Sequence, residues 1–103
     1  MNWDSLIKSF STYLRIERSL STNTIESYSN DLNKLSDFLT PKSILATKVK
    51  LNDLKDFITS ISEILSDTSQ SRIISAIKSF YKFLLIENLI QSDPSENLVS
   101  PKI

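Results

Sequence analysis

The 103-residue sequence contains no cysteine, no histidine and no glycine. Without cysteine there can be no disulfide and no thiolate metal site, and without histidine there is no imidazole for acid–base catalysis or metal binding. Without glycine, the glycine-rich loops that hold phosphates in P-loop and dinucleotide-binding proteins cannot form. Since most common enzyme classes use these groups, we expect no catalytic site, no metal and no cofactor in this chain.

The sequence also lacks a long apolar run and an excess of charge of one sign. No apolar stretch approaches the ~18 residues of a membrane-spanning helix, and the N-terminus does not resemble a signal peptide. With the lack of cysteine, this favours a cytoplasmic protein with no membrane partner and no small-molecule ligand. The 12 basic side chains balance 12 acidic ones, which counts against nucleic-acid binding, yet residues 68–86 contain Arg72, Lys78 and Lys82 and no acid.

Helical periodicity is the main feature that is present. Apolar residues recur at steps of three and four over residues 3–18, 22–39, 51–61 and 69–87, and no segment alternates like a strand. The predicted N-caps are Asn2 for the first helix, Ser21 or Thr22 for the second, and Asp67 or Thr68 for the fourth. Ile64 and Leu65 are expected to enter the core. The pattern predicts an all-α fold, a compact orthogonal bundle of four to five helices.

The character of the sequence changes after Ile90. Ser92, Asp93, Pro94 and Ser95 are typical of turns and linkers. We therefore predict a helical domain over residues 1–91 and a linker over residues 92–103, which leads toward a C-terminal domain absent from this chain.

Two polar stripes lie opposite the apolar faces of the second and fourth predicted helices. At i, i+4, i+7 and i+11 they comprise Asn23, Ser27, Asn30 and Lys34 on one helix and Ser71, Ser75, Lys78 and Lys82 on the other, with Arg72 and Ser79 beside the second. Small polar side chains let a helix approach a nucleic-acid groove, and lysine and arginine attract phosphate. Every surface helix has a polar face, however, so the pattern alone favours a solvated surface.

The aromatic residues that could do chemistry are better explained by packing. Tyr13, Tyr28 and Tyr81 lie on apolar stripes and have no histidine or arginine cluster near them in the sequence. A tyrosine nucleophile needs such partners, so we predict core positions for all three. Trp3, at the start of the first helix, is likewise predicted to be a core or staple residue in preference to a base-stacking platform.

Four segments occur in an order and spacing that resemble a known family. They are residues 21–24 with Tyr28 and residues 31–32; residues 53–54 with 57–58; residues 71–72 with 75–76 and 80–84; and residues 93–95 with Leu98 and 100–102. The chain resembles the N-terminal core-binding (SAM-like) domain of tyrosine recombinases of the XerC/XerD type and of phage integrases. In that family, this domain and a catalytic domain close around DNA as a clamp, with the second and fourth helices on the DNA.

The resemblance implies a function that the composition does not reveal. Members cleave and rejoin DNA through a tyrosine–phosphate intermediate, to resolve chromosome dimers or to move mobile elements, and the nucleophile would lie outside this chain. The implied partners are double-stranded DNA and other recombinase subunits in a synaptic tetramer. Combined with the stripes, the predicted DNA-binding residues are Asn23, Thr24, Ser27, Lys34, Ser71, Arg72, Ser75, Lys78 and Lys82.

Arg72 and Lys78 allow the predicted DNA contact to be tested by mutation. Replacing both by alanine should weaken DNA binding without unfolding the domain.

The alternative function, favoured by the zero net charge, is a helical protein-interaction module without nucleic-acid binding. An exposed apolar patch near Trp3, or around Ile86, Leu89 and Ile90, would support this alternative.

Overall fold

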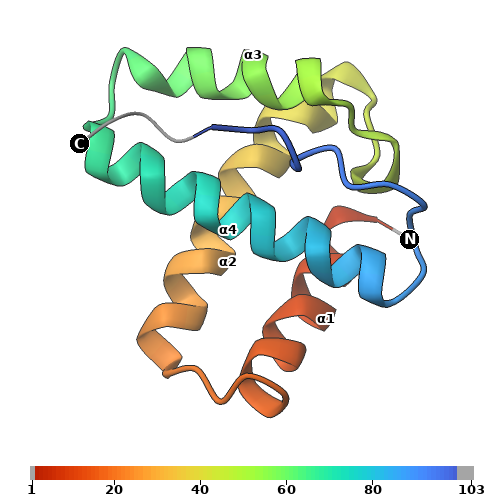
Figure 1. Ribbon diagram of the computed structural model, residues 1–103. Helices are drawn as coiled ribbons and strands as arrows, with labels where there is room; N and C mark the ends of the chain where they lie inside the picture. The colour runs from red at the N-terminus through yellow and green to blue at the C-terminus, as the bar shows by residue number, and fades with distance from the viewer. Residues whose placement is uncertain (1, 100–103) are drawn as a thin grey trace.

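The computed structural model describes residues 2–99, and over this range the protein is all-helical. Its helices are α1 (Trp3–Ile16), α2 (Thr22–Leu39), α3 (Leu51–Ser62) and α4 (Asp67–Ile86), with short 3-10 helices η1 (Thr40–Lys42) and η2 (Ala46–Lys48) between α2 and α3. The chain turns back from α1 into α2, and α4 crosses α2 and packs against α1 and α3 (Figure 1). The predicted all-α bundle is confirmed, and the two short 3-10 helices replace the loop expected between α2 and α3.

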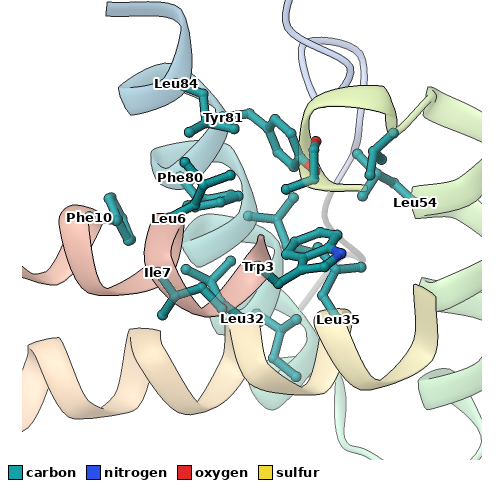
Figure 2. Packing of buried hydrophobic residues seen from close by; sticks show 14 of the residues in the cluster. Trp3, Leu6, Ile7, Phe10, Leu32, Leu35, Leu54, Phe80, Tyr81 and Leu84 are labelled. Atoms are coloured by element: carbon teal, nitrogen blue, oxygen red, sulfur yellow. The ribbon is translucent and has the colours of Figure 1, made fainter. Parts of the chain in front are cut away.

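The core lies where the four α-helices meet (Figure 2). The ring centroid of Phe80 on α4 lies 6.1 Å from that of Trp3 and 5.6 Å from that of Phe10, both on α1. Leu32 of α2 and Leu54 of α3 are fully buried in the same cluster. Burial of apolar surface, which contributes about 25 cal/mol per Å², therefore holds all four helices to one centre.

Side-chain caps fix where the helices begin. Asn2 and Ser21 cap α1 and α2, as predicted, through side-chain oxygens that accept backbone N–H bonds. The prediction for α4 was wrong: its cap is Ser66, in place of Asp67 or Thr68, and the helix begins two residues earlier than expected. The sequence contains three consecutive side chains that can cap a helix, so composition alone did not determine which one does.

The connection between α3 and α4 separates two neighbouring apolar residues. Leu65 packs against the core, as predicted, whereas Ile64 is 77% exposed, so its predicted burial was wrong. Gln70 of α4 is buried and its Nε2 donates to the Leu65 carbonyl at 3.0 Å. This bond holds Leu65 against α4, and the tight turn directs the adjacent Ile64 to solvent.

The segment after α4 runs back over the bundle (Figure 1). Leu98 belongs to the core cluster, and Ser95 is fully buried. The Ser95 backbone N–H and hydroxyl both donate to Asp93 Oδ1, at 2.8 and 2.6 Å, which closes a turn around Pro94. The packed part of the chain thus continues past residue 91, the predicted domain boundary, as far as Leu98. The last residues of the predicted linker, 100–103, lie outside the described range.

Candidate nucleic-acid interface

An ion pair joins α2 and α4 where the two helices cross. Arg72 Nε donates to Asp31 Oδ2 at 3.0 Å, and Arg72 Nη2 donates to Asp31 Oδ1 at 2.9 Å. The Asp31 side chain is 0% exposed, whereas the Arg72 side chain is 47% exposed. Hydrogen bonding to Asp31 and then its negative charge raise the pKa of Arg72, so the arginine stays charged at any physiological pH.

The sequence explains why an acid is buried at this point. Asp31 follows Tyr28 by three residues and precedes Leu35 by four, so it lies on the apolar stripe of α2 and packing turns it inward. An unpaired buried carboxylate costs several kcal/mol, and Arg72 in the second turn of α4 supplies the opposite charge with two donors. This pair was not predicted from the sequence, although an acid at an inward helical position is a usable signal.

The pair brings the two predicted stripes together. Lys34, one turn after Asp31 on α2, places its Nζ 3.9 Å from Asp31 Oδ1, and its side chain is 49% exposed. Lys34 and Arg72 therefore set two cations beside one buried carboxylate, which leaves a local net charge of +1. Both side chains reach solvent, so the crossing presents positive charge outward.

The other predicted residues of α4 extend away from the crossing. Ser75 and Lys82 are exposed and Lys78 is half-buried. Lys82 lies ten residues after Arg72, roughly 15 Å along the helix axis. Ser71 differs, because its hydroxyl oxygen is buried and finds no hydrogen-bond partner within residues 2–99. The predicted residues of α4 that are exposed are thus Arg72, Ser75 and Lys82, with Lys78 half-buried beside them.

The predicted residues near the start of α2 lie further from the crossing. Asn23 is exposed, and Thr24 and Ser27 are half-buried. Ser21, the cap of α2, donates its hydroxyl to Thr24 Oγ1 at 2.9 Å. Thr24 is roughly two turns from Asp31, so a ligand that touched both would lie along α2 and across α4.

The tyrosines pack, as predicted. Tyr81 is fully buried, and its hydroxyl donates to the Ala46 carbonyl at 3.0 Å. Burial, the largest cause, raises the pKa of Tyr81 far above its ordinary value, so this phenol stays protonated. Tyr13 and Tyr28 pack against the core.

Across residues 2–99, no group of acidic, His or Cys side chains could hold a metal ion, and no helix is long and apolar enough to cross a membrane.

The apolar patch that would favour a protein-interaction module is largely buried. Trp3 lies in the core, and its Nε1 donates to the Ile44 carbonyl at 3.0 Å. Leu89 and Ile90 are half-buried against the core. Of the residues named for this patch, Ile86 is the most exposed, at 55%, and its neighbour Leu85 is 38% exposed.

Comparison with known proteins defines the class. The family model described as the phage integrase, N-terminal SAM-like domain matches residues 7–88. That range contains the α2–α4 crossing and every predicted contact residue. The chain belongs to this family, as the resemblance implied.

The relatives of the chain are tyrosine recombinases. Tyrosine recombinase XerD of Chlorobaculum tepidum is 39% identical over 102 residues, which cover 98% of this chain and 34% of that protein. Tyrosine recombinase XerC of Leptospira interrogans is 34% identical over 93% of this chain and 32% of its own length. Tyrosine recombinase XerD of Proteus mirabilis is 35% identical over 97% and 32%. The chain spans about a third of the length of these curated relatives. No solved structure matches it.

Proposed function

We propose that this chain is the DNA-binding N-terminal domain of a site-specific tyrosine recombinase and clamps duplex DNA with α2 and α4. The observation that supports this most directly is the α2–α4 crossing, where Lys34 and Arg72 present charge to solvent. Membership of the integrase N-terminal family agrees with it. Strand cleavage and rejoining are assigned to a catalytic domain outside these residues.

The proposed contacts follow from the chemistry of each side chain. Lys34, Arg72, Lys78 and Lys82 would bind phosphates, and the short polar side chains between them, such as Ser75, would let the helices approach the backbone. The zero net charge predicts weak binding by this domain, with further affinity from the catalytic domain. The proposed partners are double-stranded DNA and other recombinase subunits in a synaptic tetramer, and the proposed location is the cytoplasm, where the DNA lies.

Lys78 and Lys82 are suitable positions for testing DNA contact by mutation. The double change Arg72→Ala, Lys78→Ala, which was expected to leave the fold intact, is not suitable. Loss of Arg72 would leave Asp31 buried without its partner, which destabilises the protein. We expect the double variant Lys78→Gln, Lys82→Gln to bind a fluorescent duplex more weakly than the parent. The slope of log affinity against log salt should become less steep by about 2. The variant lacks two phosphate contacts, so its binding releases fewer counterions.

A matched control distinguishes the loss of DNA contacts on α4 from the loss of two positive charges anywhere on the protein. Lys8→Gln with Lys55→Gln removes the same charge from exposed positions on α1 and α3 and should leave the slope nearly unchanged. Equal losses in the two double variants would reject the α4 contact surface. Absence of binding by the parent at low salt, up to about 100 µM protein, would reject the proposed function, because even non-specific DNA binding falls within that range.

A further inference from the structure

The Asp31–Arg72 pair uses only part of the arginine. A guanidinium has five N–H donors, and the bonds from Nε and Nη2 to Asp31 use two of them. The other three lie on Nη1 and on the outer side of Nη2. Because the paired edge faces a fully buried carboxylate while the Arg72 side chain is 47% exposed, the accessible edge is the one with the unused donors.

The buried carboxylate also fixes the direction of this edge. Two parallel hydrogen bonds determine both the plane and the orientation of the guanidinium. An arginine free in solvent loses much rotamer freedom when a ligand immobilises it. Arg72 has lost that freedom already through Asp31, so it is preorganised to bind with a smaller entropic cost.

The free edge has the geometry of a phosphate site. Two N–H groups on one edge of a guanidinium match two phosphate oxygens, and Lys34 adds a second cation beside the same carboxylate. We propose that Asp31 is a positioning residue that holds the free edge of Arg72 toward a backbone phosphate of a duplex lying across α2 and α4. This inference rests on the proposed function and adds the group that orients the arginine.

The substitution Asp31→Asn distinguishes positioning from simple electrostatics, because the two predict effects of opposite sign. Removing a negative charge beside Lys34 and Arg72 should tighten DNA binding if charge alone matters. If Asp31 positions Arg72, binding should weaken about tenfold, as expected for the loss of one oriented charged hydrogen bond. The slope of log affinity against log salt should also shrink by about 1, since one phosphate contact is lost.

The matched control is Asp37→Asn, which removes the same charge from an exposed position on the same helix. It should leave binding unchanged or slightly tighter. A second readout is the Arg72 Nε–H resonance in ¹⁵N NMR spectra, which should shift on addition of duplex to the parent protein. If Asp31→Asn binds as tightly as Asp37→Asn while the parent binds DNA, the positioning role is wrong and the proposed function stands. If the parent does not bind, both fail.

A second variant covers the case in which Asp31→Asn does not fold. Arg72→Lys keeps a positive charge near Asp31 but has no planar fork to share between a carboxylate and a phosphate. Circular dichroism melting would establish that it is folded at the temperature of the titration. We expect about fivefold weaker binding, and parental affinity would overturn the proposal.

Discussion

Three of the buried polar side chains within residues 2–99 are hydrogen-bonded to another element or to an adjacent loop. Asp31 binds Arg72, Gln70 donates to the Leu65 carbonyl, and Tyr81 donates to the Ala46 carbonyl. Such groups are costly to bury alone and become acceptable only when paired. These bonds therefore fix the position of α4 against its neighbours. Asp31 joins α4 to α2, Gln70 joins it to the preceding turn, and Tyr81 joins it to η2.

The bond from Tyr81 to Ala46 gives a prediction for a single hydroxyl group. Tyr81→Phe keeps the ring in the core but leaves the Ala46 carbonyl without this donor. We expect a loss of about 1–2 kcal/mol in the free energy of unfolding, measured by urea denaturation, with DNA affinity unchanged.

The control for this experiment is Tyr13→Phe, at a half-buried tyrosine on α1. It should change the free energy of unfolding by no more than about 0.5 kcal/mol. A similar small change in both variants would mean that the Tyr81 hydroxyl makes no net contribution to stability.

The start of α4 allows a test at the scale of one element. Ser66 accepts a hydrogen bond from the Ser69 backbone N–H at 3.2 Å, while Thr68 lies inside the helix and is exposed. We expect Ser66→Ala to lower the free energy of unfolding by about 1 kcal/mol, because a helix N–H loses its partner. Thr68→Ala should have little effect. Thermal melts of the two variants compare the predicted cap with the observed one, and a larger loss at Thr68 would contradict the structure.

Periodicity predicted the elements well, because apolar spacing reports directly which face of a helix is buried. α2 was predicted with its observed ends, since Ser21 and Pro41 are strong local signals at both boundaries. The helix α1 ends two residues earlier than predicted, and α4 begins two residues and ends one residue earlier, where the signals were weaker or repeated. The crossing of α2 and α4 was not predicted, because it depends on contacts between residues about forty positions apart.

The same distinction applies to the candidate site. The stripes follow from spacing along one helix, which sequence alone reveals. That Lys34 and Arg72 meet at one carboxylate depends on how two helices pack, as does the burial of the Ser71 hydroxyl. The predicted DNA-binding residues therefore include exposed cations at the α2–α4 crossing and a buried hydroxyl at Ser71. Only the structure distinguishes these environments.

At the scale of the whole molecule, the main question is where the packed domain ends. The sequence after Ile90 has the composition of a linker, yet Leu98 is 5% exposed and belongs to the core cluster. A turn-rich segment can pack in this way because its few apolar side chains are anchored by local hydrogen bonds, here those between Ser95 and Asp93. If the chain continues in a longer protein, the packing of Leu98 would determine where the following residues leave the helical bundle.

Leu98 and Val99 provide an adjacent pair with which to test this arrangement. Leu98→Ala removes a buried side chain and should lower the free energy of unfolding by about 2–3 kcal/mol, as for other leucine truncations in a core. Val99 is 81% exposed, so Val99→Ala should change it by less than about 0.5 kcal/mol. Urea denaturation of both variants gives the comparison. Equal, small effects would show that residues 92–99 detach from the bundle in solution, and would support the domain boundary predicted at residue 91.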